Sequence, residues 1–392
     1  MLRSKIKIVV TGGGSGGHLS VAKAILQALT ENYDIPSNNI HYIGSDLGMI
    51  GEKKGNSLEK KIMKDSPVNK HYIRAGKLQR KLSPNSIPLL LRTFLGIKDS
   101  FKILRKEKPN FIISAGGYVS VPVCFSAWIL RIPIYLHEQT ASVGLSNKIA
   151  GKFAKKIYLS FESSKKYFRE SKTSHVGNIV RKHIFIKDMT PDTDKEILSL
   201  NVTNKELPLI YISGGGLGSH KINVKVLDSI KELLKSYRIL LQTGSNSIYK
   251  DYEKGLEFRN KLPAFLKERF VVKKYIDEKS IGYVINNMDI FVGRSGANTV
   301  YELGVLKKVA LLIPIPWVTH NEQYLNAKIL KDVGTANILE DKYLEKSDLK
   351  KEIERLKKQI QLRKIEYDKL EKLFPRNALA HILDDILQNY LK

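Results

Sequence analysis

The sequence predicts an α/β protein with two domains, each built on a doubly wound, Rossmann-like parallel sheet. At 392 residues, the chain is longer than a single hydrophobic core usually supports. Short apolar runs of strand length alternate with stretches of helical periodicity, which is typical of repeated βα units. A glycine-rich turn follows an early apolar run, and a similar turn returns 202 residues later, at position 213 after position 11.

The first βα unit opens the chain. The apolar run Ile6–Val10 predicts a buried strand, and the periodicity of Ser20–Leu29 predicts the following helix. The turn 11–18 between them contains the pattern G-x-G-x-x-G, whose glycines let backbone N–H groups approach a phosphate at a helix N-terminus. Because one such match is weak evidence, two alternatives stay open. They are a dinucleotide-binding dehydrogenase with Asp46 as its ribose acid, and a tight turn that binds nothing.

A second βα unit of the same kind starts the other half of the chain. Leu209–Ile212 predicts a strand and Ile222–Leu234 a helix. The turn 213–220 between them agrees with the turn 11–18 at five of eight positions, and both turns end in histidine. The two turns therefore suggest two domains of one architecture. The alternative is chance similarity between glycine-rich turns, but the shared order of the flanking elements argues against it. Further strands are expected at 40–43, 111–114, 132–136, 157–160, 239–242, 290–292 and 309–313.

The domain boundary is expected near Gly177–Arg181. We assign residues 1–178 to an N-terminal domain and 179–375 to a C-terminal domain. The highly charged segment Lys342–Leu373 predicts an exposed helix, which Pro375 ends. The amphipathic helix 376–392 is expected to pack back on the N-terminal domain.

Composition narrows the choice of partners and compartment. The formal net charge of +27 favours polyanionic partners such as nucleic acid, anionic lipid or phosphorylated substrates, although a general lysine bias also contributes. Cys124 is the one cysteine, so no disulfide framework exists and a reducing compartment fits. The apolar run at the start of the sequence, which ends before Gly12, is too short for a signal peptide. Pro122 interrupts the longest apolar stretch, Val119–Leu130, which therefore predicts no bilayer span.

Several motifs argue against other classes of enzyme. No G-x-x-x-x-G-K-[ST] is present, so a P-loop ATPase is not expected. The segment His137–Thr140 lacks the second histidine of a zinc protease. The acids of one D-x-D pattern, Asp192 and Asp194, suit a solvated turn better than a metal site. We therefore expect no metal and no cofactor.

Two polar segments in the second half follow predicted strands, where open α/β sheets bind ligands. The segment 294–302 predicts a turn and a helix start at which Ser295 or a neighbour caps the helix and leaves N–H groups free for an anion. Glu302 could then accept both hydroxyls of a ribose, although a surface glutamate is the ordinary alternative. The polar loop 314–323 could bind sugar hydroxyls, or be an ordinary βα loop.

The segment Arg74–Lys108 combines positive charge with apolar residues. It holds ten Lys or Arg and two Asp or Glu, interleaved with leucines and a phenylalanine. Such a segment suits the interface of an anionic membrane, although a solvated basic face over a normal helix core explains it as well. RNA binding is a weaker option because no RNA-binding module is present. The residues expected at the membrane are Arg80, Lys81, Leu91, Arg92, Phe94 and Trp128.

Together the motifs resemble those of the MurG family, the UDP-N-acetylglucosamine:lipid-linked muramyl-pentapeptide transferases of peptidoglycan synthesis. The matching stretches occur in the family's order across most of the chain. They are TGGGSGGH at 11–18, SAGGYVSVP at 114–122, LHEQTASVGLSNKIA at 136–150, GNIVR at 177–181, GRSGANTVYELG at 293–304 and HNEQYLNA at 320–327.

The resemblance implies a GT-B fold, two Rossmann-like domains with a cleft between them. The N-terminal domain would take the undecaprenyl-linked acceptor at the cytoplasmic face of the bacterial membrane, and the C-terminal domain would take UDP-GlcNAc. The reaction would invert configuration and give a β-linked product without a covalent sugar–enzyme intermediate. Cell-wall synthesis proteins would be further partners, and nucleic acid would not.

The resemblance also assigns roles to residues. His18 is implied as the base that activates the acceptor hydroxyl, or as a residue that orients phosphate, and Glu302 as the ribose-binding acid. The implied contacts of the acceptor diphosphate are Ser15, Gly16, Gly17, His18, Gly116, Gly117 and Tyr118. The implied contacts of UDP-GlcNAc are Thr140, Arg181, Gly216, Ile276, Ser295, Gly296, Ala297, Thr299, Glu302 and Gln323.

The sequence departs from the family pattern at several donor positions. Thr140 stands where the family usually has Asn, and Gly216-Leu217 replaces Ser-Gln in the second glycine turn. Ile179 replaces Pro and Glu322 replaces Gln. Two further classes therefore stay open beside the dehydrogenase: a transferase that makes glycolipid on a diacylglycerol-type acceptor, and a binder of nucleotide sugars without activity.

Overall fold

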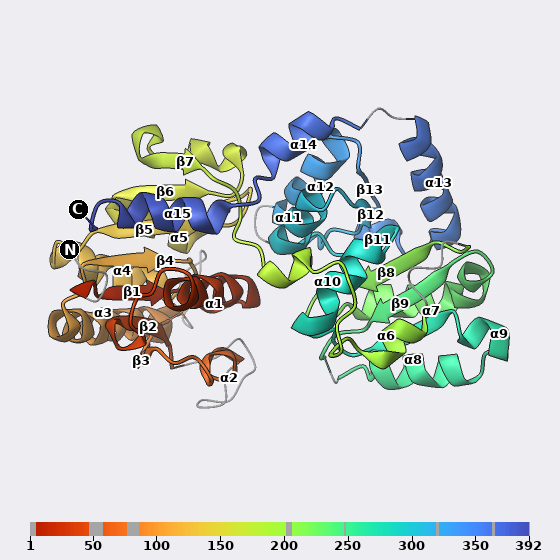
Figure 1. Ribbon diagram of the computed structural model, residues 1–392, viewed down its shortest axis with the longest axis horizontal. Coiled ribbons are helices and arrows are strands. Elements are labelled where there is room, and N and C mark those ends of the chain that lie inside the picture. The colour runs from red at the N-terminus through yellow and green to blue at the C-terminus, as the bar shows by residue number, and fades with distance from the viewer. Residues whose placement is uncertain are drawn as a thin grey trace. The chain divides into compact units, whose positions relative to one another are not determined.

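The computed structural model describes residues 5–46, 58–76, 86–200, 206–246, 248–318, 321–362 and 365–391. The chain divides into two compact units (Figure 1). The first comprises Met1–Val180 with Pro375–Lys392, and the second comprises Arg181–Phe374. The division lies inside the expected boundary segment, and each unit contains one parallel sheet.

The first unit has a seven-stranded parallel sheet in the order β3-β2-β1-β4-β5-β6-β7, counted over the described residues. Its strands are β1 (Ile8–Thr11), β2 (Ile40–Ser45), β3 (Asn69–Ile73), β4 (Phe111–Ser114), β5 (Ile134–Glu138), β6 (Lys156–Leu159) and β7 (Thr173–His175). Its helices are α1 (Gly16–Glu31), α2 (Leu58–Met63), α3 (Ser86–Glu107), α4 (Ser120–Ile129), α5 (Leu145–Phe153) and α15 (Ala378–Leu387).

The central strands of this sheet are apolar on both faces because helices cover both. Ile8 and Val10 of β1 belong to a core that α1 and α15 complete. Val9, between them in sequence, belongs to a second core with residues of α3, α4 and α5. Since side chains alternate between the faces of a strand, such doubly covered strands are continuous hydrophobic runs.

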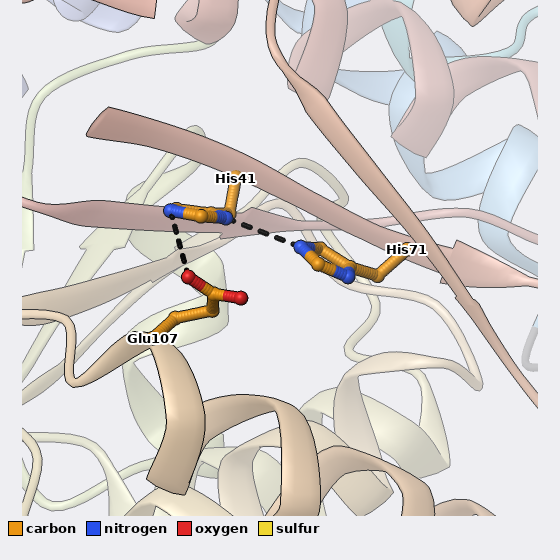
Figure 2. Close-up of side chains that lie close together, drawn as sticks. All are labelled: His41, His71 and Glu107. Carbon is orange, nitrogen blue, oxygen red and sulfur yellow. Dashed lines mark hydrogen bonds and ion pairs between the residues drawn. The ribbon is translucent and has the colours of Figure 1, made fainter. Parts of the chain in front are cut away.

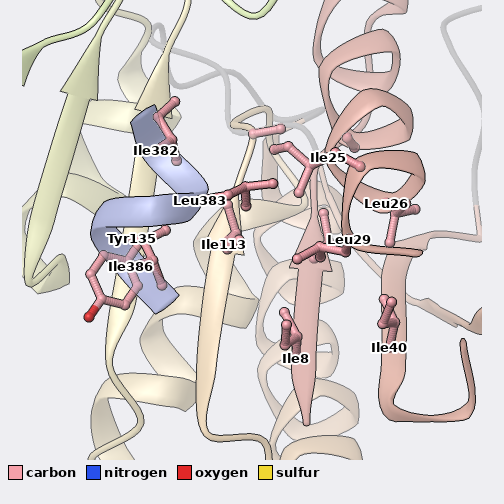
Figure 3. Close-up of a cluster of buried hydrophobic side chains, with 14 of the residues drawn as sticks. Ile8, Ile25, Leu26, Leu29, Ile40, Ile113, Tyr135, Ile382, Leu383 and Ile386 are labelled. Carbon is pink, nitrogen blue, oxygen red and sulfur yellow. The ribbon is translucent and has the colours of Figure 1, made fainter. Parts of the chain in front are cut away.

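The C-terminal helix α15 completes the core of the first unit. Ile382, Leu383 and Ile386 are fully buried beside β1, β4 and α1 (Figure 3). Asp385 adds an ion pair to Lys156 on β6, with 2.8 Å between carboxylate oxygen and Nζ. Residues separated by more than 200 positions thus share one core.

The second unit repeats the architecture with six described parallel strands in the order β10-β9-β8-β11-β12-β13. Its strands are β8 (Leu209–Ser213), β9 (Arg238–Gln242), β10 (Phe270–Lys273), β11 (Ile290–Gly293), β12 (Val309–Leu312) and β13 (Ala336–Ile338). Its helices are α6 (Lys195–Ser199), α7 (His220–Leu234), α8 (Asp251–Asn260), α9 (Ala264–Lys267), α10 (Glu278–Asn287), α11 (Ala297–Val305), α12 (Glu322–Asp332), α13 (Leu349–Leu362) and α14 (Tyr367–Leu373).

The charged segment 342–373 is less exposed than expected. Leu349, Ile353 and Leu356 of α13 are buried in the core of the second unit, beside the strand residues Ile210 and Val292. The helix is therefore amphipathic, with three leucine or isoleucine side chains fixing one face, and its high charge obscured that pattern.

The strand order places a binding edge in each unit. Strands β1 and β4 are neighbours at the point where the order of the first sheet reverses, and β8 and β11 hold the same place in the second. In open parallel sheets, ligands bind beyond the carboxyl ends of the strands at such a point. The glycine turns 12–15 and 115–117, and 214–218 and 294–296, all lie there.

Candidate functional site

The two glycine turns of the first unit are in direct backbone contact. The Gly13 N–H donates to the Gly116 carbonyl at 3.3 Å. Gly117 has a φ of +89°, and a Cβ atom there would lie 2.0 Å from the Gly13 oxygen. At Gly14, a Cβ atom would lie 2.3 Å from the Tyr118 ring. Side chains at these positions would separate the turns, so the sequence motif reflects a steric requirement.

The N-terminus of α1 forms part of the same edge. Ser15 is its N-cap, and the Ser15 hydroxyl accepts from the His18 N–H at 3.4 Å. The space beside Gly16 is open, and the first turn of the helix has no acidic residue. An anion here would meet unpaired N–H groups and the positive end of the helix dipole. The residues expected to bind the acceptor diphosphate are therefore brought together.

The His18 side chain lies against the glycine turn 115–117 of the first unit. Its Nδ1 atom lies 2.9 Å from the Ala115 carbonyl oxygen, and the Gln139 amide nitrogen donates to the same oxygen at 2.9 Å. A carbonyl oxygen has two lone pairs and can accept from both donors. The same Gln139 nitrogen lies 2.9 Å from His18 Nδ1. We assign the imidazole proton to Nδ1, where it is donated to Ala115, and this assignment leaves Nε2 unprotonated. Burial lowers the pKa of His18, although its bond to Ala115 opposes the shift, so the ring is a neutral base near pH 7.

Thr140, which was expected to contact the donor, is engaged inside the first unit. Its hydroxyl lies 2.7 Å from Glu138 Oε1 and 2.7 Å from the Ser142 carbonyl. The other oxygen of Glu138 accepts from the Asn147 amide at 2.8 Å. Burial raises the pKa of Glu138, and the hydrogen bonds from Thr140 and Asn147 oppose this shift. Thr140 therefore helps to hold a buried acid, a role that the sequence did not indicate.

The glycine turn of the second unit is packed like the first. Gly218 has a φ of +83°, and a Cβ atom there would lie 1.9 Å from the Thr243 carbonyl oxygen. At Gly216 a Cβ atom would meet open space. The Gly216 carbonyl accepts from the Ser245 N–H at 3.0 Å, which ties this turn to the one after β9. Gly218 is thus required by packing, and Gly216 borders the open side.

A buried arginine connects three loops at this edge. Arg294 donates to the Ser219 hydroxyl at 2.8 Å and to the Ile313 carbonyl at 3.0 Å. It also pairs with Asp341 at 2.6 Å, and both side chains are almost fully buried. The loops after β8, β11 and β12 are therefore held by one guanidinium group, whose planar fork suits several acceptors at once.

Arg181 and Glu302, both expected at the donor, contact each other. Arg181 Nε and Nη2 donate to the two oxygens of Glu302, each at 2.8 Å. Burial alone would lower the pKa of Arg181, but the Glu302 carboxylate raises it overall, so Arg181 stays charged. Each carboxylate oxygen keeps a second lone pair. Glu302 can therefore still accept two further hydroxyl groups while Arg181 fixes its orientation.

Helix α11 begins with no side-chain cap. Gly296 is its N-cap, and the Ser295 hydroxyl instead donates to the Gln323 carbonyl at 2.9 Å. The expected cap at Ser295 is thus replaced by a tie to α12. The N–H groups of Ala297 and Thr299 lie in the first turn, where helical partners are lacking. This turn can therefore receive an anion.

Two more residues of the expected donor set lie near this edge. The Gln323 side-chain oxygen accepts from the Ile315 N–H at 3.1 Å, so the amide is fixed against the loop after β12. Ile276, after β10, is buried, and its N–H donates to Gln242 at 3.2 Å. Gln242 in turn donates to the Ser213 hydroxyl at 3.2 Å, below the glycine turn.

The residues expected at the membrane differ in their surroundings. Leu91 and Phe94 on α3 are 59% and 67% exposed, so an apolar surface exists there. Trp128 is exposed on α4, but its ring packs against Phe125 and Phe153. Arg80 and Lys81 lie outside the described residues. No helix in the described part of the chain is long and apolar enough to cross a membrane.

Arg92, expected in the membrane rim, forms an ion pair within the first unit. Its Nη2 atom donates to both oxygens of Asp46, at 2.7 and 2.8 Å. Asp46 is the acid that a dinucleotide-binding dehydrogenase would need to bind the ribose, and here it is engaged by Arg92. Spacing could not reveal the pair, because Asp46 follows β2 whereas Arg92 lies on α3, 46 residues later.

Three residues of the candidate site were not predicted from the sequence. Gln139 holds the carbonyl group that orients His18, and Asp341 pairs with Arg294. His220 is 2.7 Å from Asp251 and stacks on Tyr249, with ring centroids 4.0 Å apart. The repeated histidine at the end of each glycine turn was a signal for His220, whereas its partners are distant in sequence.

Both halves of the chain match a known family. The glycosyltransferase family 28 N-terminal domain matches residues 8–159, and the C-terminal domain of the same family matches residues 209–380. A UDP-N-acetylglucosamine--N-acetylmuramyl-(pentapeptide) pyrophosphoryl-undecaprenol N-acetylglucosamine transferase from Clostridium novyi is 31% identical over 91% of this chain and 92% of its own length. A relative of the same name, numbered 2, from Bacillus anthracis is 33% identical over 89% and 91%.

Solved structures share the fold. MurG from Acinetobacter baumannii superposes with a TM-score of 0.68 at 19% identity, covering 98% of this chain and 99% of its own. A UDP-GlcNAc 2-epimerase from Neisseria meningitidis, bound to UDP-GlcNAc, gives 0.61 at 15% identity, covering 98% and 100%. At these identities the likeness concerns the fold, a GT-B arrangement of two parallel-sheet domains.

Proposed function

The chain belongs to glycosyltransferase family 28 and, within it, to the MurG transferases, and from this premise we propose its reaction. It transfers N-acetylglucosamine from UDP-GlcNAc to undecaprenyl-diphosphate-linked N-acetylmuramyl-pentapeptide in peptidoglycan synthesis. The observation that carries this function is 31% identity to such a transferase over 91% of the chain, through both domains. The enzyme is thus a UDP-GlcNAc-dependent hexosyltransferase that serves cell-wall growth, cell shape and division.

We propose that the second unit binds the donor. Glu302 would accept the two ribose hydroxyls with the lone pairs that Arg181 leaves free. The first turn of α11 would receive the diphosphate through the N–H groups of Gly296, Ala297 and Thr299. Gly216, Ile276, Ser295 and Gln323 line the same carboxyl edge of the sheet. Two features of the second unit support this assignment. They are the pair of Arg181 with Glu302 and the N-terminus of α11, which has no side-chain cap.

We propose that the first unit binds the acceptor and supplies the base. The interlocked turns and the α1 N-terminus would take the acceptor diphosphate. His18 Nε2 would accept the proton of the attacking hydroxyl, while the hydroxyl oxygen forms a bond to C1 of the sugar. The bond from C1 to the UDP oxygen breaks, and UDP leaves with the electron pair. Such a single displacement inverts configuration at C1, without a metal ion or a covalent intermediate.

We propose that the exposed apolar surface of α3 enters the membrane interface. A lipid-linked acceptor requires an enzyme associated with the membrane, here on the cytoplasmic face. Leu91 and Phe94 can provide the apolar contact, and the exposed Lys98, Lys102 and Arg105 of the same helix provide positive charge. Arg92 of the same helix pairs with Asp46, so its charge is partly neutralised and we expect it to contribute less.

The transfer assay tests the function and the role of His18 together. The wild-type enzyme should move radiolabelled GlcNAc from UDP-GlcNAc to the lipid-linked muramyl-pentapeptide and not to diacylglycerol. His18→Ala should lower kcat roughly 10²–10⁴-fold, because loss of a general base typically costs that much. Labelled glycolipid as the product would contradict the acceptor. A loss of less than about tenfold would leave His18 a role in positioning only.

The donor site can be tested with paired changes in protein and ligand. Glu302→Ala should weaken UDP binding roughly 30–150-fold, because a charge-assisted contact to two hydroxyls contributes about 2–3 kcal/mol. In the wild type, 2′-deoxy-UDP should bind more weakly than UDP, and Glu302→Ala should remove most of that difference. Calorimetry that finds the same preference for the 2′-hydroxyl in both proteins would refute the contact.

Vesicle co-sedimentation tests the membrane surface. Changing Leu91 and Phe94 together to Ser should reduce binding to anionic vesicles roughly 10–100-fold, since both side chains would bury apolar area in the interface. UDP affinity should stay unchanged, and Phe265→Ser, which alters an equally exposed phenylalanine of the second unit, should have no effect. Equal sedimentation of the double variant and the parent would show that another surface binds the membrane.

A further inference from the structure

Two histidines and a glutamate converge at the first unit, on elements that the proposed reaction does not use. His41 lies on β2, His71 on β3 and Glu107 at the C-terminal end of α3 (Figure 2). His41 stands next to the start of its strand and Glu107 is the last residue of its helix, whereas the glycine turns follow the carboxyl ends of the strands. The cluster is therefore separate from the edge assigned to the acceptor.

The register of the sheet explains why these side chains meet. His71 pairs with Ile43, two residues after His41 on the neighbouring strand, so both histidines point to the same face. Ile43 and Ile73 show that this face packs against α3 and α4, because they belong to that core. Lys7 fixes the end of α3 by donating to the Glu107 carbonyl at 3.3 Å. The helix end thus holds the Glu107 side chain beside His41.

The hydrogen bonds of the cluster leave one buried nitrogen unsatisfied. His41 is 4% exposed. Its Nδ1 atom lies 3.1 Å from His71 Nε2, and its Nε2 atom lies 3.7 Å from a Glu107 oxygen. The second distance is too long for a hydrogen bond, and His41 Nε2 has no hydrogen-bond partner in the described part of the chain. A buried polar atom of this kind requires an explanation, and a role as a metal ligand is one.

We propose that His41, His71 and Glu107 form a binding site for a divalent transition metal of the zinc class. This goes beyond the proposed transfer reaction and differs from our expectation from sequence that the chain binds no metal. In the part of the chain that the structure describes, this is the group of His, Cys, Asp and Glu side chains whose ligand atoms all lie within 4.8 Å of one another.

The geometry suits such an ion. For three atoms within 4.8 Å of one another, one point lies within about 2.8 Å of all three. Small rotations of the side chains would reach the bond lengths of about 2.0–2.2 Å that zinc makes with imidazole and carboxylate. His41 would bind through Nε2, the buried nitrogen that lacks a hydrogen bond, and its 3.7 Å separation from the Glu107 oxygen is somewhat longer than the separation of about 3.3 Å expected for two ligand atoms of a tetrahedral ion.

The chemistry of the donors also fits. Two imidazoles and one carboxylate form a set that zinc accepts, and water would supply the fourth ligand because His71 and Glu107 are partly exposed. Burial lowers the pKa values of both histidines, which favours the neutral rings that metals bind. Lys7 and Lys106 are near enough to act on His41, and their charges oppose a dication. We therefore expect moderate rather than very tight affinity.

An ion at this position would join three elements. It would connect the edge strand β3 to β2 and both strands to the C-terminal end of α3. The N-terminal half of the same helix carries the exposed Leu91 and Phe94. A ligand that binds the folded state stabilises it, so metal should stabilise this part of the first unit.

The test uses the full-length protein, stripped of metal and titrated with zinc alone. Calorimetry should detect a site that His71→Ala weakens at least tenfold and that Glu107→Gln weakens to a smaller extent. Saturating zinc, at about 100 times the dissociation constant, should raise the thermal midpoint of the parent by roughly 5–10 °C. Cobalt in place of zinc should give visible absorption bands of a four-coordinate ion.

His381→Ala is the matched control, because His381 is an exposed histidine of the same unit. It should bind zinc like the parent. Glu107→Gln keeps the shape of the side chain and guards against a variant that fails to fold. If the parent binds no zinc, or if His71→Ala binds it as tightly as the parent, the cluster is a hydrogen-bonded histidine pair and the proposal is wrong. Neither result would bear on sugar transfer, which is measured separately.

Discussion

The close contact of two glycine turns is the constraint on which the first unit depends. Parallel strands β1 and β4 are neighbours, so the turns that follow them must share one small space. Gly117 and Gly13 meet backbone to backbone, and Gly14 receives the Tyr118 ring. This contact brings the Ala115 carbonyl oxygen to His18 Nδ1, to which we assign the imidazole proton. The N-terminus of α1 stays open beside it. Sheet topology thus imposes the steric fit of the turns, and this fit in turn sets the surroundings of His18.

The second unit meets the same constraint with different residues. Gly218 contacts the Thr243 backbone, while Arg294 fixes the surrounding loops through a buried ion pair. Arg181 orients Glu302 before any nucleotide is present. The departures at Gly216 and Leu217 fall on the open side of the turn, where no packing is lost. The family's architecture therefore persists although two polar side chains of the turn have been replaced.

Much of the fold and part of the site could be predicted from the sequence. The strands expected from apolar runs are the interior ones, which helices cover on both faces. The strands that were missed, β3, β7, β10 and β13, are the four edges of the two sheets, where polar residues interrupt or shorten the pattern. Motifs located Glu302 and His18, but the pairing of Arg92 with Asp46 and the tie of Ser295 to Gln323 depend on contacts that spacing cannot reveal. The histidine cluster at His41 had no motif at all.

The central claim is that the packing of the turns keeps His18 as a neutral base with a free Nε2. Nitrogen chemical shifts of His18, followed through a pH titration of the full-length enzyme, measure this directly. The account predicts a proton on Nδ1, an unprotonated Nε2 at pH 7, and a pKa below the ordinary value of 6.5, because burial outweighs the bond to Ala115. A proton on Nε2 at pH 7, or a pKa above 6.5, would contradict it.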